Sequence, residues 1–357
     1  MIKRKQTKTV KVGNINIGGN NPIVVQSMTN TPTTDVDVTL EQIDGLADRG
    51  CELVRVGVPD SKSAESLPEI VSRSPVPIVA DIHYSPELAL MAIDGGVAKL
   101  RLNPGNITDE GAIREIASSA KSKSVPIRVG VNSGSLDREI VEKYGRTPEA
   151  MVVSAQKELE LLESQGFEDI LVSLKSSEVN TTIEANEKFS EKYDYPLHLG
   201  VTEAGGGRSG IVKSAIGIGT LLRKGIGDTI RVSLTADPRE EVDVAYDILG
   251  SLGIRNRGID IVSCPTCART EIDVQGAGRE LEKRLGEVSA TLKVALMGCS
   301  VNGIGEAGSS NLGIVGTAKG GVLYVDGKQE DLISSSNTQD LVDRVEERIR
   351  GYLEERD

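Results

Sequence analysis

The sequence predicts a parallel α/β fold, most economically a (β/α)₈ barrel followed by a smaller α/β domain. Between residues 20 and 236, a short β-branched run, a polar turn and an amphipathic stretch recur in that order, as in alternating strands and helices. The chain also holds 39 glycines, two phenylalanines and no tryptophan. That composition is typical of tightly packed α/β units with short turns rather than an aromatic-rich sandwich.

The number of predicted strands selects the barrel. Eight runs in this region have strand character: 23–26, 53–58, 77–80, 98–102, 126–131, 170–174, 197–201 and 229–234. Helical segments lie between them, for example 39–49, 86–92, 109–119 and 149–165. An open, doubly wound sheet is the alternative, but such sheets usually stop at five or six strands. Eight strands therefore favour closure into a barrel.

A second unit follows the helical stretch 240–252 and the polar break 253–258. Its predicted order is strand, helix and three strands, at 259–262, 271–285, 293–297, 312–315 and 322–325. Asp326-Gly327 predicts a hairpin turn, and a final helix is indicated by the spacing of Leu341, Val345, Ile349 and Leu353. We therefore expect a barrel domain over 1–252 and a second domain over 253–357.

Composition and charge limit the partners. A formal charge of −12 and a pI of about 5.0 argue against nucleic acid and anionic membranes as ligands. The basic N-terminal run lacks the apolar segment of a signal peptide, and no apolar stretch approaches the roughly 20 residues that span a bilayer. We expect a cytoplasmic protein. Four cysteines do not make a disulfide scaffold, and a close cysteine pair in a reducing compartment is more typical of metal binding or catalysis.

Polar residues gather where the predicted barrel strands end, which is where barrel enzymes carry their chemistry. They are Gln26, Arg55, Asp81, His83, Arg101, Asn103, Arg128, Asn132, Lys175, His198, Glu203 and Arg231. Any single arginine here is equally well explained as a paired or edge-exposed side chain. Together, however, the cations outnumber the interior carboxylates, so a dianionic ligand such as a diphosphate is expected. The glycine-rich segment 202–210, after the seventh strand, could add backbone N–H groups for a phosphate. The two histidines are too few for a histidine-based metal site.

Three cysteines form the second chemical feature. Cys264 and Cys267 follow one predicted strand of the second unit with Cys-x₂-Cys spacing, and Cys299 follows the next strand. Cys51 precedes the second barrel strand and is best explained as a buried structural thiol. The fourth ligand is then open or an oxygen donor, and Glu306 is the nearby carboxylate. Zinc remains an alternative, but the absence of histidine here and the abundance of glycine favour an iron–sulfur cluster.

Six motifs, taken in order along nearly the whole chain, resemble those of the 4-hydroxy-3-methylbut-2-enyl diphosphate synthase family of the methylerythritol phosphate isoprenoid pathway. They are Val-Gln-Ser-Met-Thr-Asn (25–30), Val-Arg-Val-Gly-Val-Pro (54–59), Val-Ala-Asp-Ile-His (79–83), Arg-Val-Gly-Val-Asn-Ser-Gly (128–134), Cys-Pro-Thr-Cys (264–267) and the segment 297–306. The family loop usually reads Asn-Gly-Pro-Gly-Glu, and here Ile304 stands at the proline position.

The resemblance implies a barrel plus a cluster domain, with a [4Fe–4S] cluster held by Cys264, Cys267, Cys299 and Glu306. The implied substrate is the cyclic diphosphate of 2-C-methyl-D-erythritol, which two electrons convert to an allylic diphosphate with loss of water. A flavodoxin or a ferredoxin would donate the electrons. A homodimer is also implied, in which the cluster domain of one subunit closes over the barrel of the other.

The resemblance further assigns roles to single residues. Diphosphate binding falls to Arg55, Arg101, Arg128 and Lys175, with Asp81, His83 and Asn132 close by. Glu203 would be the acid or base near the reacting carbons, and Asn302 would approach the substrate from the cluster side. The count of three cysteines separately leads to the hypothesis that the substrate displaces Glu306. Two other functions are compatible with the residues alone: a non-redox iron–sulfur hydratase, and a zinc-stapled binding or regulatory protein.

Overall fold

The computed structural model describes residues 2–83, 85–102, 109–286, 288, 290–334 and 337–356 of the chain. The chain divides into two compact units, Met1–Arg255 and Asn256–Asp357. The division falls after Arg255, whereas the boundary predicted from the sequence follows residue 252. Each unit has its own hydrophobic core, so we describe the two separately.

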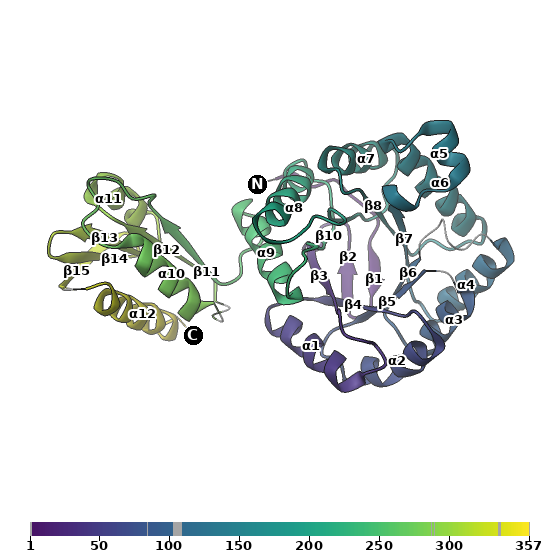
Figure 1. Cartoon of the computed structure of the whole chain (residues 1–357), viewed down its shortest axis with the longest axis horizontal. Coiled ribbons are helices and arrows are strands. Elements are labelled where there is room, and N and C mark those ends of the chain that lie inside the picture. The colour runs from purple at the N-terminus through teal and green to yellow at the C-terminus, as the bar shows by residue number, and fades with distance from the viewer. Residues whose placement is uncertain are drawn as a thin grey trace. The chain divides into compact units, whose positions relative to one another are not determined.

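The first unit is a parallel barrel, as predicted from the recurring strand and helix pattern (Figure 1). Its strands pair in the order β8-β7-β6-β5-β4-β3-β10-β9, and a parallel bridge between Val172 and Leu197 returns β9 to β8. The strands are β3 (Val24–Met28), β4 (Leu53–Gly57), β5 (Ile78–Ile82), β6 (Lys99–Leu102), β7 (Ile127–Asn132), β8 (Ile170–Lys175), β9 (His198–Leu199) and β10 (Thr229–Ile230).

Nine helices of the described chain surround these strands (Figure 1). They are α1 (Val36–Asp48), α2 (Ser61–Arg73), α3 (Pro86–Asp94), α4 (Glu110–Ser122), α5 (Arg138–Tyr144), α6 (Pro148–Ser164), α7 (Val179–Lys192), α8 (Gly207–Arg223) and α9 (Pro238–Ser251). Most begin at a side-chain cap: Asp35, Asp60 and Ser85, for example, each accept a hydrogen bond from a backbone N–H of the first turn. Their apolar faces pack on the outward-facing strand residues.

A hairpin that the sequence analysis did not anticipate closes the N-terminal end of the barrel. Strands β1 (Val10–Val12) and β2 (Ile15–Ile17) pair in antiparallel fashion, and their Val10, Val12 and Ile17 side chains form a separate buried cluster with residues at the starts of strands β3, β4 and β8. Apolar side chains therefore fill the space between this hairpin and the barrel strands.

Two predicted strands are shorter than expected. The segments 197–201 and 229–234 form ladders only at β9 and β10, two residues each. Their apolar residues beyond the ladders, such as Val201 and Val232, are buried all the same. A β-branched run reports burial as well as strand pairing, which explains the overestimate.

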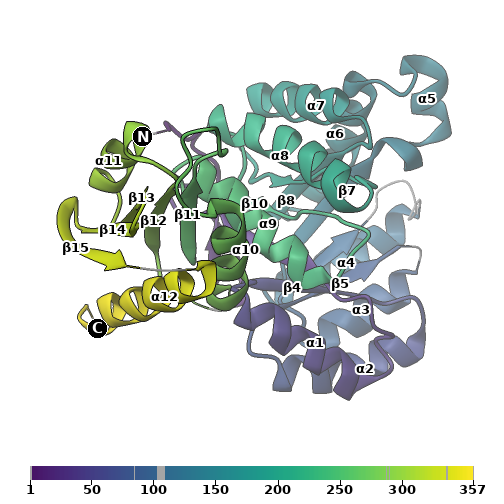
Figure 2. The ribbon, with the colours of Figure 1, turned by 60° about the vertical axis from the view of Figure 1, so that its left-hand side comes forward.

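The second unit is a five-stranded sheet covered by helices on both faces (Figure 2). Its strands lie in chain order, β11 (Ile259–Ser263), β12 (Leu292–Met297), β13 (Leu312–Thr317), β14 (Gly320–Val325) and β15 (Lys328–Ser334), the first three parallel and the last two antiparallel. Helices α10 (Val274–Leu285) and α12 (Thr338–Glu354) share one core with the sheet. Helix α11 (Ser300–Gly308) contributes Ala307 to a smaller cluster with Val315 and Tyr324.

The predicted hairpin turn is confirmed. Val325 pairs with Lys328, so Asp326 and Gly327 form a two-residue loop, and both have positive φ (44° and 77°). The edge strand β15 was not predicted because its first residues, Lys-Gln-Glu-Asp, are polar and exposed.

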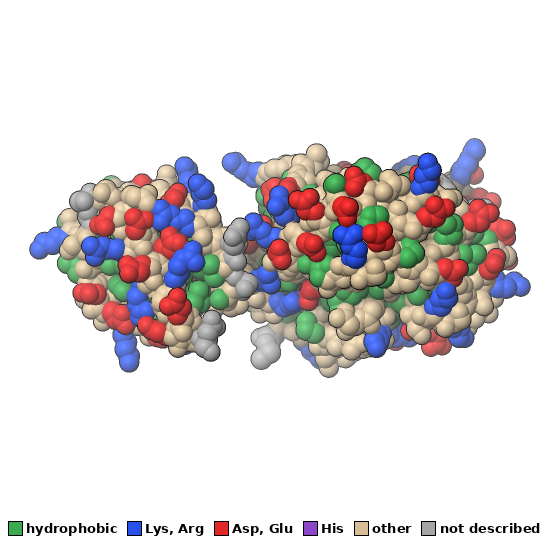
Figure 3. Space-filling model, turned by 90° about the horizontal axis from the view of Figure 1, so that it is seen from below, with side chains coloured by type: hydrophobic (Ala, Val, Ile, Leu, Met, Phe, Trp, Pro, Cys, Tyr) green, Lys and Arg blue, Asp and Glu red, His purple; other side chains and the backbone are tan. Residues whose placement is uncertain are grey.

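No helix in the described part of the chain is long and apolar enough to cross a membrane. On the face shown in Figure 3, acidic and basic side chains are interspersed over both units. The concentration of positive charge that matters most is buried inside the barrel instead.

Candidate active site

Strand alternation directs a set of charged side chains into the barrel. In β6, Leu100 and Leu102 join the outer core, so Lys99 and Arg101 point to the inside. The same alternation turns inward Arg55 of β4, Asp81 of β5, Arg128 of β7 and Lys175 of β8. All six side chains are buried, with residue exposures between 0% and 9%.

Asp81 is the central carboxylate of this group. Its Oδ1 accepts a hydrogen bond from Arg101 Nη1 at 3.0 Å, and its Oδ2 lies 3.6 Å from Arg55 Nε and 3.4 Å from His83 Nε2. Arg55 also donates to Met28 Sδ, at 3.1 Å from Nε and 2.9 Å from Nη2. The structure thus brings together four of the predicted substrate-binding residues: Arg55, Asp81, His83 and Arg101.

The pKa values in this group reflect burial opposed by charge. Burial alone would raise the pKa of Asp81, but Arg55, His83 and Arg101 outweigh it and hold this pKa well below its ordinary value. Burial, with Arg231 and Arg101 nearby, lowers the pKa of Arg55 to about 10 in spite of Asp81. The carboxylate is therefore firmly ionised, and the arginines have too little negative charge around them.

Arg128 and Lys175 carry the excess positive charge. Arg128 is 1% exposed, and its Nε and Nη1 are buried without a hydrogen-bond partner among the described residues. Burial and the neighbouring cations lower the pKa of both side chains well below their ordinary values. Buried polar groups are normally satisfied, so these donors indicate a missing acceptor. An anion entering the barrel would supply it.

Two charged residues of the interior, Lys99 and Glu241, were not predicted as site residues. Lys99 is completely buried, its Nζ donates to Gln26 Oε1 at 3.4 Å, and burial together with Arg128 and Arg55 lowers its pKa well below the ordinary value. The available signal was its position two residues before Arg101. Glu241 of α9 is also buried and pairs with Arg231 at 3.2 Å.

The remaining predicted barrel residues do not join the Asp81 group. His198 is fully buried, and its Nδ1 lies 3.4 Å from Thr229 Oγ1. Asn132 ends β7 opposite Lys175 in the ladder and is half-buried. Glu203 is exposed in the loop after β9 and has a φ of 52°, a strained conformation for a non-glycine residue. Asn103 lies outside the described residues.

The three predicted ligand cysteines lie on two neighbouring loops of the second unit. Cys264 follows β11, and Cys299 follows the adjacent parallel strand β12 and caps α11. Cys264 is half-buried, Cys267 is exposed, and all three thiols are free. The Cys264 Sγ accepts a hydrogen bond from the Gly298 N–H at 3.2 Å. Backbone N–H groups aimed at cysteine sulfur are a feature of iron–sulfur sites, where they tune the cluster.

Helix α11 places Asn302 and Glu306 on one face. They follow its N-cap, Cys299, by one and two turns, Asn302 is exposed, and Glu306 is half-buried. Three thiolates and a carboxylate fit a cluster chemically. The described His, Cys, Asp and Glu side chains nevertheless form no group of three or more that could hold a metal ion. Metal binding commonly gathers its own ligands, so the ligand set remains a proposal.

Cys51 does not belong to this set. It is 2% exposed in the barrel unit, its Sγ lies 3.1 Å from the Leu53 carbonyl oxygen, and burial raises its pKa to about 12. The expectation of a buried structural thiol is confirmed.

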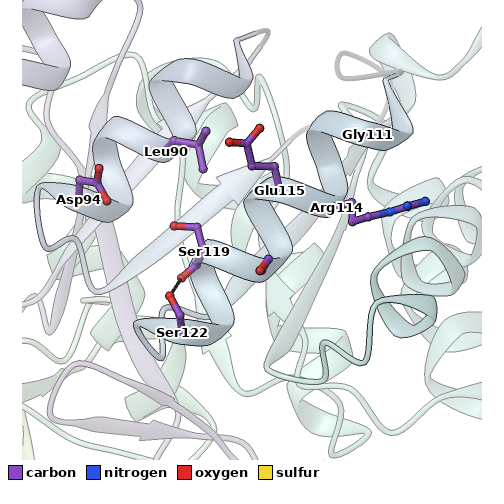
Figure 4. Close-up of a pocket in the computed structure, with 8 residues that line it drawn as sticks. Leu90, Asp94, Gly111, Arg114, Glu115, Ser119 and Ser122 are labelled. Atoms are coloured by element: carbon purple, nitrogen blue, oxygen red, sulfur yellow. Dashed lines mark hydrogen bonds between the residues drawn. The ribbon is translucent and has the colours of Figure 1, made fainter.

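A hollow on the outside of the barrel, between α3 and α4, is a poor rival site (Figure 4). Its charged lining residues are Asp94, Glu115 and Arg114, so negative charge exceeds positive. The lining residues come from two outer helices, whereas the buried cations come from the strands. An anionic ligand would favour the barrel interior.

Family models match both units. The model described as the GcpE TIM-barrel domain covers residues 7–246, and that of the GcpE protein C-terminal domain covers residues 260–351. This chain belongs to the GcpE family.

Similar chains match this one over nearly their whole length. The chain is 52% identical to the 4-hydroxy-3-methylbut-2-en-1-yl diphosphate synthase (flavodoxin) of Persephonella marina over 95% of this chain and 97% of that one. It is 52% identical to the protein of the same name from Caldanaerobacter subterraneus (98% and 99% covered), and 48% identical to that of Aquifex aeolicus (98% and 98%).

Solved structures of other enzymes share the barrel alone. Dihydropteroate synthase from Stenotrophomonas maltophilia matches with a TM-score of 0.51 at 15% identity, covering 70% of this chain and 100% of that one. N-acetylneuraminic acid synthetase from Leptospira borgpetersenii matches with a TM-score of 0.51 at 14% identity, covering 70% and 92%. At these identities the likeness shows the fold of the GcpE barrel and nothing about its chemistry.

Proposed function

We propose that this chain is a 4-hydroxy-3-methylbut-2-enyl diphosphate synthase of the methylerythritol phosphate isoprenoid pathway. It opens the ring of 2-C-methyl-D-erythritol 2,4-cyclodiphosphate by two-electron reduction and removes water. The observation that carries this proposal is the charge of the barrel interior. Arg55, Arg101, Arg128 and Lys175 are buried there, and Asp81 is the only carboxylate among the described residues that pairs with any of them. Buried cations in this excess are stable only with an anion among them. The names of the relatives support the same substrate class.

The charge balance of the reaction fits this interior. The cyclic substrate has one ionised oxygen on each phosphorus, whereas the product ends in a phosphate with a second ionisation near neutral pH. Two electrons and one proton enter, the ring C–O bond to phosphate breaks, and a hydroxyl leaves as water. One further negative charge therefore develops on the released phosphate. Fixed cations in a water-poor site stabilise such a charge more in the transition state than in the substrate.

The barrel residues would divide this task. Arg101, Arg128 and Lys175 bind the diphosphate, and Asp81 holds the guanidinium groups of Arg101 and Arg55 in place through its ion pairs. His83 follows the C-terminal end of β5, Asn132 ends β7, and both would complete the substrate contacts. Glu203, exposed in the loop after β9, is the proposed acid or base for the departing hydroxyl.

The second unit would carry a [4Fe–4S] cluster on Cys264, Cys267, Cys299 and Glu306. Such a cluster supplies single electrons and a Lewis-acidic site for a substrate oxygen. The Gly298 N–H donates a hydrogen bond to the Cys264 sulfur, and Asn302 lies one turn before Glu306 on the same face of α11. A carboxylate is a more readily exchanged ligand for iron than a thiolate, so Glu306 would mark the replaceable position.

We further propose an electron donor, a cellular location and an oligomeric state for this protein. The electron donor is a flavodoxin, as in the relatives' names. The protein works in the reducing cytoplasm, in keeping with its four free thiols. It is a homodimer in which the cluster unit of one copy serves the barrel of the other.

Anaerobic purification followed by iron and sulfide analysis tests the cofactor. We expect four irons and four sulfides per chain, loss of iron in Cys264→Ser and Cys299→Ser, and full loading in Cys51→Ala, which serves as the matched control. Zinc in place of iron would exclude the redox enzyme.

Product analysis by mass spectrometry, with the cyclic diphosphate and reduced flavodoxin, tests the reaction. We expect the allylic diphosphate only when the reductant is present. Turnover without a reductant would identify a hydratase instead.

Mixing two inactive variants tests the dimer. Arg128→Ala removes a proposed substrate contact, and Cys267→Ser removes a proposed cluster ligand. Coexpressed copies should regain part of the activity if one barrel and the other chain's cluster form each site. Isolated mixed dimers without activity would exclude this arrangement.

A further inference from the structure

A glycine occupies an inward-facing position in the middle of a charged barrel strand. Strand β7 reads Ile-Arg-Val-Gly-Val-Asn, and its alternation turns Arg128, Gly130 and Asn132 to the inside. Glycine within a strand is destabilising by roughly 0.5–1 kcal/mol relative to alanine. Gly130 is not among the residues with positive φ, so the backbone conformation does not require it. A close approach by another group is the usual remaining reason.

The group that approaches is the guanidinium of Arg101. A Cβ at position 130 would lie 2.8 Å from Arg101 Nε and 3.4 Å from its Nη2, and 3.3 Å from the Leu102 carbonyl oxygen. The Arg101 guanidinium therefore lies against the β7 backbone, in space that any other side chain would fill. From there its Nη1 reaches Asp81 Oδ1 at 3.0 Å, while its Nε is buried without a hydrogen-bond partner in the described part of the chain.

We propose that Gly130 is a positioning residue for diphosphate binding, because the absence of a side chain at this position leaves the space that the Arg101 guanidinium occupies. The inference rests on the proposed function. Non-bonded carbon and nitrogen atoms stay about 3.5 Å apart, so a methyl group at position 130 forces the guanidinium away from β7 by several tenths of an ångström. Arg101 then loses its alignment with Asp81 and with the phosphate.

Gly130 is the clearer of two such positions. A Cβ at Gly200 of the segment after β9 would meet Lys175 Nζ at 2.7 Å, but it would also meet the Arg231 carbonyl oxygen at 2.6 Å. Substitution there would shift the backbone. At Gly130 the closest atom belongs to the far end of a flexible side chain, so alanine is compatible with the fold and acts mainly on Arg101.

A double-mutant cycle on the cluster-loaded protein tests this inference. Titration calorimetry with the cyclic diphosphate, without reductant, gives Kd for wild type, Gly130→Ala, Arg101→Ala and the double variant. We expect Gly130→Ala to weaken binding about 10- to 100-fold in the wild-type background. In the Arg101→Ala background, the same substitution should change Kd less than twofold. Gly219→Ala of α8, where a Cβ meets nothing within 4 Å, is the matched control and should bind like wild type.

Each outcome decides the matter. Equal effects of Gly130→Ala in both backgrounds, or wild-type affinity of that variant, would overturn the inference and leave the proposed function standing. A wild-type protein that does not bind the cyclic diphosphate would overturn both. If Gly130→Ala fails to fold while the double variant folds, the clash with Arg101 is established and the inference is supported.

Discussion

The two units use arginine in opposite ways. In the second unit, Arg284 of α10 is paired with three carboxylates: Nε lies 2.9 Å from Glu280, and Nη1 lies 2.7 Å from Asp343 and 2.9 Å from Glu346. In the barrel the ratio is reversed, because one carboxylate, Asp81, lies within 3.6 Å of Arg55, Arg101 and His83. The charge of Arg284 is compensated by its carboxylate partners, whereas the cations of the barrel have too few carboxylates to compensate them.

Burial sharpens this difference. The Arg284 side chain is 25% exposed, and its carboxylate partners raise its pKa. Arg128 is almost fully buried, and burial lowers its pKa. Water can stabilise the first charge, but only a ligand can stabilise the second. Buried cations that outnumber the nearby carboxylates therefore indicate an anion-binding site. A cation with enough carboxylate partners indicates an ion pair that stabilises the packing of helices.

The largest effect is expected where the carboxylate shared by Arg55 and Arg101 is removed. Asp81→Asn keeps the shape but leaves Arg55 and Arg101 buried without a counter-charge, which should destabilise the barrel by about 3–5 kcal/mol. Urea unfolding of this variant measures the loss. Added pyrophosphate should restore part of the stability by binding the uncompensated cations. A loss below about 1 kcal/mol would show that the arginines do not depend on Asp81.

Removal of a buried cation should instead raise the free energy of unfolding. Arg128→Met deletes a charge whose Nε and Nη1 have no partner among the described residues, so we expect a gain of about 1–4 kcal/mol together with loss of substrate binding. The matched control is Arg231→Met, which leaves the buried Glu241 without its cation partner and should lower stability. Calorimetric unfolding of both variants decides the point. A destabilised Arg128→Met protein would mean that this charge is satisfied in the free enzyme.

Much of this arrangement could be predicted, because it depends on local periodicity. The barrel follows from recurring strand and helix patterns, and Arg55, Arg101 and Arg128 were noticed because each interrupts an apolar run. Lys99 was overlooked although the same period of two places it beside Arg101 on the inner face. That omission was one of interpretation, since the signal was present.

Other features depend on contacts that no local pattern reveals. Glu241 meets Ser27 only because α9 packs against β3, which comes from a distant part of the sequence. Helix α11 was read as a loop because its segment contains Gly303, Gly305 and Gly308, which have low helix propensity. The cysteine spacing predicts ligand types, but the final geometry depends on the metal that gathers them.

A half-buried carboxylate of α6, Glu158, extends the comparison to pH. Burial raises the pKa of Glu158 in α6 to about 7, despite Lys157. Because this pKa is raised above that of the unfolded chain, near 4.5, stability is fully present below pH 4.5 and is lost as pH rises toward 7. Glu158→Gln should therefore match wild type at pH 4 and exceed it by about 1–2 kcal/mol at pH 8. Melting curves at both pH values test this, with the exposed Glu160→Gln as control; a gain of equal size at pH 4 would exclude titration as the cause.

The smallest effect is expected at the ion pair that is already complete. Arg284→Met removes the cation that links α10 to the carboxylates of α12, but each released carboxylate can be solvated. We expect the melting temperature to fall by no more than about 2 °C, and the difference from wild type to vanish in 1 M salt because screening weakens exposed pairs. The methionine keeps the apolar contacts of the arginine stem, so packing is conserved. A large, salt-independent loss would mean that this arginine is as dependent on its partners as those of the barrel, and the contrast between the two units would then lie in burial alone.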